Sequence, residues 1–204
     1  MIKAEIHGIF PTPLYTTKLG RKFTKTELHF IEKMRAKSRP NMGNTTSSNK
    51  NILNEPSFSI LKKEINLFIE DYFAKIIFPL EAISPYITQS WLNYTEINEH
   101  HHPHYHQNSY LSGILYIAAD KEHDNIAFWN NKYDQIHIYP TQWDQFNSDV
   151  WFLPVETGGI IIFPSSLKHS VPAKKGKNSR ISLSFNVFVK GNLGQPQDSN
   201  ELKL

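Results

Sequence analysis

The stretch "GGIIIFPSSLKHSVPAKKGKNSRISLSFNVFV", residues 158–189, holds two apolar runs separated by a polar segment rich in turn-forming residues. Apolar and polar side chains alternate along the second run, residues 180–189, which is the pattern of a β-strand with one buried face. The odd-numbered residues 181–189 then face the core, and Arg180, Ser182 and Ser184 lie on the opposite face. The stretch therefore predicts two strands, at residues 158–163 and 180–189, with an arginine at the start of the second.

The same period of two appears upstream and predicts further strands at residues 86–97, 110–119, 126–129 and 135–139. The first part of the chain differs, with apolar residues at helical spacing in 23–37 and 57–78. Thr24 and Glu27 form a capping-box pattern at the start of the first helix. A short strand with proline breaks precedes it and ends near Gly20. We expect a polar, mobile loop at 38–51 and a frayed tail after Gly191.

Helices followed by a run of antiparallel strands indicate an α+β fold, mainly β, built round a sandwich or jelly roll. We expect a single domain over residues 1–204. Residues 1–85 supply an N-terminal strand and supporting helices, 86–190 form the core, and 191–204 form the tail.

The composition excludes several kinds of site. The 204 residues are 39% hydrophobic with a net charge of +3, too mild to argue for nucleic-acid binding. The absence of cysteine excludes disulfides, thiolate metal sites and a cysteine nucleophile, so any metal must bind to nitrogen and oxygen. The first fifteen residues contain no apolar run like that of a signal peptide, and no stretch is apolar and long enough to span a bilayer. We therefore expect a cytoplasmic location.

Histidines are crowded in "EHHHPHYHQNSYLSG", residues 99–113. In an extended backbone, positions 100, 102, 104 and 106 share one face, while His101 and Tyr105 point away. Neutral imidazole is a good ligand for iron, zinc, copper and nickel. A third ligand must come from a distant segment, and His169, just past an apolar strand, is the best candidate. The isolated histidines 7, 29, 123 and 137 are expected to have no catalytic role.

Arg180 and Ser182 form a polar pair on the non-core face of their strand. A guanidinium beside a hydroxyl is well matched to a carboxylate. The basic run "AKKGK" at 173–177 is read as a solvated turn that could attract an anionic partner.

The His-x-His pair, "NSYLSGILYI" and the stretch 158–189 together resemble the iron(II)- and 2-oxoglutarate-dependent oxygenases of the prolyl-hydroxylase-like type. The likeness is greatest to a small branch found in bacteria and phages. If the chain is phage-encoded, the expected location is the host cytoplasm. The resemblance implies a double-stranded β-helix, or jelly roll, braced by helices. It also implies Fe(II), 2-oxoglutarate and O2, with hydroxylation of a C–H bond and release of succinate and CO2.

Carried over to this chain, the family motif assigns the metal to His104, His106 and His169. Arg180 would bind the distal carboxylate of 2-oxoglutarate with help from Ser182, and Tyr116 would line the co-substrate pocket. The family's middle ligand is an acid two residues after the first histidine, and here that position is His106. No residue beyond the metal ligands is assigned to catalysis.

Several alternatives stay open from the sequence. Water could replace His106, or Glu99, Asp120 or Asp124 could supply the acid, and the pairs 100/102 and 102/104 offer other registers. The chain could also be a non-catalytic metal- or ligand-binding module, or a three-histidine dioxygenase that does not use 2-oxoglutarate. The prime substrate could be a polypeptide, an amino acid or a nucleobase, and the oligomeric state is not determined.

Overall fold

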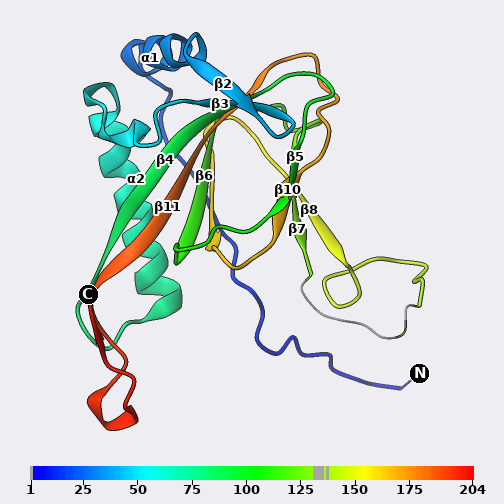
Figure 1. The fold of residues 1–204 in the computed structure, drawn as a ribbon. Coiled ribbons are helices and arrows are strands. Elements are labelled where there is room, and N and C mark those ends of the chain that lie inside the picture. Colours follow the sequence, from blue (N-terminus) through cyan, green and yellow to red (C-terminus); the bar gives the residue numbers. More distant parts are fainter. Residues whose placement is uncertain (1, 131–135, 137) are drawn as a thin grey trace.

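The structure is a computed structural model that describes residues 2–130, 136 and 138–204. It is mainly β, with two antiparallel sheets and a small set of helices (Figure 1). The larger sheet has the order β1-β9-β6-β11-β4-β3-β2, and β12 also pairs with β11; the smaller sheet has the order β5-β10-β7-β8.

The strands have the following bounds: β1 Tyr15–Lys18, β2 Ser38–Asn41, β3 Asn44–Ser47, β4 Ile83–Thr95, β5 His101–His104, β6 Leu111–Ala118, β7 Asn125–Trp129, β8 Val150–Pro154, β9 Gly159–Pro164, β10 His169–Val171, β11 Arg180–Leu193 and β12 Leu202–Lys203. The helices are α1 Lys25–Arg35, α2 Ser59–Tyr72, the π-helix η3 Phe73–Ile77, and the short 3-10 helices η1 Ile52–Asn54, η2 Pro56–Phe58 and η4 Pro196–Asp198. None of the helices in the described part of the chain is long and apolar enough to cross a membrane.

Helix α2 covers one face of the larger sheet, and the smaller sheet faces the other side (Figure 1). The capping box predicted for α1 is confirmed: Thr24 N donates to Glu27 Oε2 at 2.7 Å, and Glu27 N donates to Thr24 Oγ1 at 3.2 Å. The main core lies between these helices and the sheet, and it includes Leu61, Ile65 and Leu183.

Strand β11 has the two faces that its alternation predicts. Residues 181, 183, 185, 187 and 189 join the core on the helix side. Arg180, Ser182 and Ser184 line a cavity on the other side, toward the smaller sheet. Gly113 on β6 is required by close packing here, because a Cβ at that position would lie 2.0 Å from the ring of Phe185. The polar face of β11 is thus available to a site between the sheets.

Three local expectations were wrong. Residues 38–51 contain the hairpin β2–β3, whose second strand pairs with β4, because β-branched threonines suit a strand as well as a loop. The tail folds back as β12, with mutual backbone hydrogen bonds between Gly191 and Leu204. His169 begins strand β10 instead of lying in a loop.

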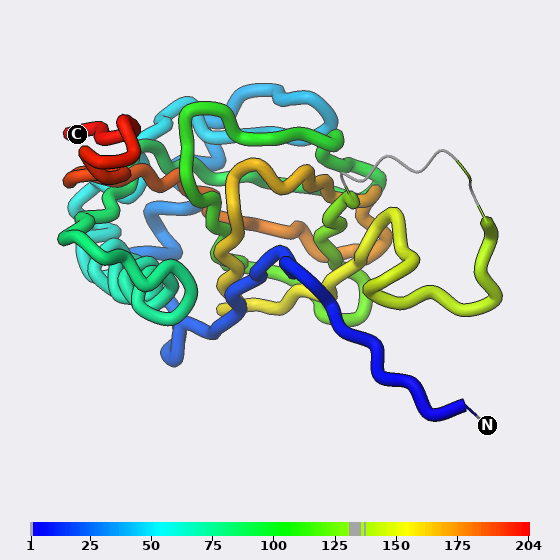
Figure 2. Tube along the Cα trace, turned by 90° about the horizontal axis from the view of Figure 1, so that it is seen from below, coloured from blue at the N-terminus to red at the C-terminus, as the bar shows by residue number. Residues whose placement is uncertain are grey.

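The predicted strand at 135–139 lies partly outside the described residues, and its described members 136, 138 and 139 are in no strand. The two ends of the chain lie at opposite sides of the molecule, with the N-terminal segment extending away from the sheets (Figure 2). The remaining predicted strands and both helices are confirmed in position, with ends that differ by a few residues.

Candidate metal and co-substrate site

Three imidazoles from two distant segments converge between the sheets. His104 on β5 lies directly opposite His169 on β10, and their ring centroids are 4.3 Å apart. His106 follows β5, where its backbone N–H donates to Ser165 O at 3.2 Å. One nitrogen from each of the three side chains lies within 4.8 Å of the others. The structure thus brings together the three residues for which the sequence predicted a metal-binding role.

Hydrogen bonds orient each imidazole through its Nδ1 atom. The acceptors are His102 O for His104 at 2.7 Å, Leu167 O for His169 at 3.0 Å, and Asn186 Oδ1 for His106 at 2.6 Å. Because a carbonyl oxygen can only accept, each Nδ1 carries the proton, and each Nε2 keeps its lone pair. Metal-ligating histidines have this arrangement, with the second nitrogen held by an oxygen acceptor.

The spacing of the nitrogens fits a metal ion. His104 Nε2 and His106 Nε2 are 3.1 Å apart. With both Nδ1 atoms protonated, no proton lies between these two lone pairs, and their contact is repulsive without a cation. Two nitrogens at right angles on an ion, each about 2.1 Å from it, are roughly 3.0 Å apart. The donor set is therefore compatible with a divalent transition metal.

Burial keeps these imidazoles neutral. It lowers the pKa of His106 to about 4 and that of His169 to about 3, and it also lowers the pKa of His104. The backbone and Asn186 hydrogen bonds act in the opposite direction but are the smaller effect. Neutral imidazole is the form that binds metal.

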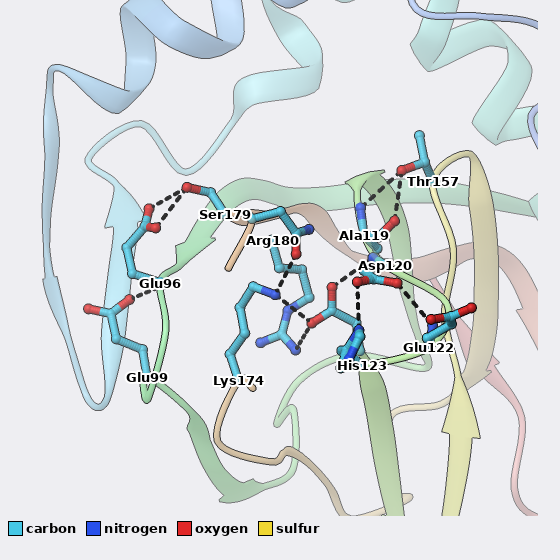
Figure 3. A network of polar contacts seen from close by, with 12 residues as sticks. Glu96, Glu99, Ala119, Asp120, Glu122, His123, Thr157, Lys174, Ser179 and Arg180 are labelled. Atoms are coloured by element: carbon cyan, nitrogen blue, oxygen red, sulfur yellow. Dashed lines mark hydrogen bonds and ion pairs between the residues drawn. The ribbon is translucent and has the colours of Figure 1, made fainter. Parts of the chain in front are cut away.

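The acids that could have completed the site are engaged elsewhere. Glu99 accepts from Glu96 N at 2.7 Å, and Asp120 pairs with His123 at 2.7 Å (Figure 3). Asp124 is fully buried with Lys174 Nζ 3.1 Å away. Among the described residues, no carboxylate belongs to the group formed by the three histidines.

The prediction that His101 points away was wrong. The pairing His169–His104 and Val171–His101 sets the four residues 101–104 of β5 against the three residues 169–171 of β10, which is a β-bulge. The bulge shifts the alternation, so the His101 ring lies 4.4 Å from that of His104 and lines the same cavity. His100 and His102 are outside the group of three, so the alternative registers are not the ones assembled here.

The cavity continues from the histidines to Arg180. Its polar floor comes from the neighbouring strands β4 and β11 of the larger sheet, and Tyr116 on β6 forms part of the wall. The residues that form this floor and wall are Asn93, Thr95, Tyr116, Arg180, Ser182 and Ser184. Arg180 is only 3% exposed, and burial lowers its pKa, with the neighbouring Tyr116 and Asp124 acting against that shift.

The basic run 173–177 is not simply a solvated turn. Lys175 and Lys177 are exposed, but Lys174 is fully buried against Asp124 and Asn178. The sequence contains no signal that separates Lys174 from the other two lysines, because its burial depends on an acid fifty residues away in the chain. Lys174 is therefore a residue near the site that sequence reasoning missed.

An open groove lies outside the histidines. Trp91 forms its wall and stacks on His106, with ring centroids 5.6 Å apart at 20°. The hairpin β2–β3 and the segment after it contribute Asn41, Thr46 and Lys50, and Asn186 and Gln107 line the groove as well. Of the isolated histidines, 7, 29 and 123 are exposed, and His137 lies outside the described residues.

Comparison with known proteins agrees with this geometry. Residues 89–186 match the family described as "Putative 2OG-Fe(II) oxygenase". No curated protein sequence matches the chain significantly.

Solved structures share the fold at low sequence identity. A prolyl-4-hydroxylase of Pseudomonas putida has a TM-score of 0.56 at 12% identity, covering 86% of this chain and 92% of that one. A prolyl hydroxylase of Trichoplax adhaerens, solved with a hypoxia inducible factor peptide, has a TM-score of 0.62 at 9% identity, covering 86% and 83%. HygX of Streptomyces hygroscopicus, solved with nickel, 2-oxoglutarate and hygromycin B, has a TM-score of 0.57 at 9% identity, covering 86% and 82%.

Residues 89–186 of this chain therefore match the 2OG-Fe(II) oxygenase family that the sequence resemblance predicted.

Proposed function

We propose that this protein is an Fe(II)- and 2-oxoglutarate-dependent dioxygenase with a double-stranded β-helix core, and that His104, His106 and His169 hold its metal. One observation carries the proposal: three neutral imidazoles and a buried guanidinium open into the same cavity. Iron(II) with 2-oxoglutarate and O2 supplies the oxidation, which inserts oxygen into a C–H bond and releases succinate and CO2.

His104, His106 and His169 would hold the metal, and the cavity that all three line would give a 2-oxo acid and O2 access to it. An imidazole in place of the usual carboxylate leaves the site more positive by one charge. A dianionic co-substrate compensates for this charge when it binds.

Arg180 is proposed to bind the distal carboxylate of 2-oxoglutarate. Its guanidinium is buried and lines the same cavity as the histidines, where a carboxylate would find a strong, desolvated partner. Ser182 is proposed to add a hydrogen bond from the same face of β11, and Tyr116 to close the wall. This arrangement favours the oxygenase over a three-histidine dioxygenase without a 2-oxo acid, in which Arg180 would have no ligand.

The groove outside Trp91 and His106 is proposed to receive the prime substrate. It is adjacent to the metal position and open to solvent, and its lining combines one aromatic wall with amide, hydroxyl and lysine groups. Hydroxylation of a protein side chain or of a small molecule fits this lining equally. A cytoplasmic location, in the host if the chain is phage-encoded, stays a prediction.

Succinate release tests the proposal. The protein is incubated in air with iron(II), ascorbate and 2-oxoglutarate, without prime substrate, and succinate is measured. We expect slow, iron-dependent formation of succinate that is lost in His169→Ala and Arg180→Ala and kept in the matched control His123→Ala. Metal binding with no succinate above the metal-free background would instead favour a non-catalytic binding module.

A further inference from the structure

A buried group of three charges lies behind the cavity. Asp124, immediately before β7, has Lys174 Nζ 3.1 Å from its Oδ1 and Arg180 Nη1 3.7 Å from the same oxygen. The exposed fractions of these side chains are 0%, 0% and 4%. Lys174 and Arg180 thus converge on one carboxylate (Figure 3). Only Arg180 of the three lines the cavity.

The group carries a net single positive charge, because two cations share one anion. Arg180 and Asp124 alone would form a neutral pair, and the field of Arg180 in the cavity would be largely cancelled. Because Lys174 also pairs with the Asp124 carboxylate, the positive charge of the Arg180 guanidinium is not fully neutralised. An unmatched buried charge is costly unless a ligand of opposite sign binds it.

Hydrogen bonds hold the segments that carry all three members of the group. Asp120 N donates to Asp124 Oδ2 at 2.8 Å, and Asp124 N donates to Asp120 O at 2.7 Å. The backbone of Lys174 exchanges hydrogen bonds of 2.9 Å with the segment before β5, donating to Glu99 O and accepting from Asn98 N. Ser179, next to Arg180, donates to the Glu96 carboxylate at 2.7 Å. The charges are therefore held in place before any ligand binds.

We propose that Asp124 and Lys174 are positioning residues for the co-substrate. Asp124 holds the Arg180 guanidinium in place, and Lys174 prevents Asp124 from neutralising it. The inference rests on the proposed function, because it assumes that Arg180 binds the distal carboxylate of 2-oxoglutarate. Neither residue lines the cavity, so both act through Arg180.

A pair of 2-oxo acids separates this role from a purely structural one. 2-Oxoglutarate and 2-oxopentanoate have the same chain length and the same metal-chelating end, but 2-oxopentanoate has a methyl group in place of the distal carboxylate. The iron(II)-loaded protein is titrated anaerobically with each acid, and the dissociation constant is read from the visible charge-transfer band. Circular dichroism and the iron affinity check that each variant is folded.

In Lys174→Met the group becomes neutral, and we expect the dissociation constant for 2-oxoglutarate to rise about tenfold or more, the size of one charge-assisted hydrogen bond. The value for 2-oxopentanoate should stay unchanged. In Asp124→Asn/Lys174→Met the single positive charge returns, but the carboxylate that holds Arg180 in place is gone. The dissociation constant for 2-oxoglutarate should therefore rise by an intermediate factor, about threefold. The double variant buries no unpaired lysine or aspartate, so it tests the proposal even if Lys174→Met does not fold.

Equal losses for both acids in these variants would show a general structural role and overturn the proposal, and so would unchanged affinity for 2-oxoglutarate. The proposed function fails in a different way: the wild-type protein would then bind the two acids equally, or Arg180→Ala would bind 2-oxoglutarate as well as the wild type does.

Discussion

His104 and His169 lie directly opposite each other on the antiparallel strands β5 and β10, although 65 positions separate them in the chain. This pairing brings the imidazoles to a ring-centroid distance of 4.3 Å. The backbone of the smaller sheet therefore positions two of the three proposed metal ligands.

Loss of either paired histidine should remove the metal. Replacing a hydrogen-bond partner of a metal ligand typically costs 10–100-fold in affinity, so we expect His104→Ala and His169→Ala to weaken iron(II) binding by more than about a hundredfold. His123→Ala, which changes an exposed histidine outside the site, should bind iron(II) like the wild type. Anaerobic competition with a chromophoric chelator measures the affinities. Wild-type affinity in His169→Ala would contradict the assignment.

Substitutions at His106 test whether it is a ligand. His106→Leu should lose iron(II) affinity because it offers no donor atom, whereas His106→Asp should retain it, since it restores the acid of the family motif. The same chelator competition applies. If His106→Leu binds iron(II) as tightly as the wild type, then water occupies the third position and His106 has another role.

Asn186 should matter because it orients His106. Its Oδ1 accepts from His106 Nδ1 at 2.6 Å, so Asn186→Ala frees the ring and is expected to lower metal affinity about 10–100-fold. Asn192→Ala is the matched control, because Asn192 lies on the same strand and bonds to the exposed Glu201. Calorimetric titration with a divalent metal distinguishes the two variants, and equal affinities would show that the Asn186 contact is incidental.

The metal-free protein should lose stability as the pH falls below about 6.5. Burial lowers the pKa of His101 and His169 to about 3 and that of His106 to about 4, against 6.5 in the unfolded chain. Between these values the unfolded state binds more protons, so acidification favours unfolding. Urea unfolding in the presence of a chelator, from pH 7.5 to 5.5, measures how steeply the free energy of unfolding falls with pH. This slope should be shallower in His106→Gln, and an identical slope in both proteins would count against the burial of a neutral His106.

The parts of the fold that depend on local pattern could be predicted from the sequence. The two faces of β11 follow from its alternation, and the start of α1 follows from Thr24 and Glu27, which lie three residues apart. The position of His101 could not be predicted, because the bulge that turns it inward is set by pairing with β10. The burial of Lys174 likewise depends on Asp124, and the strand β3 on its pairing with β4.

The most direct test of the account is an anaerobic titration of the iron(II)-loaded protein with 2-oxoglutarate, followed through the visible charge-transfer band at neutral pH. We expect the band to saturate in the wild type and in Arg39→Ala, which changes an exposed arginine on β2, and to be absent or strongly weakened in Arg180→Ala. Tight iron binding with no band at any concentration of 2-oxoglutarate would contradict the account.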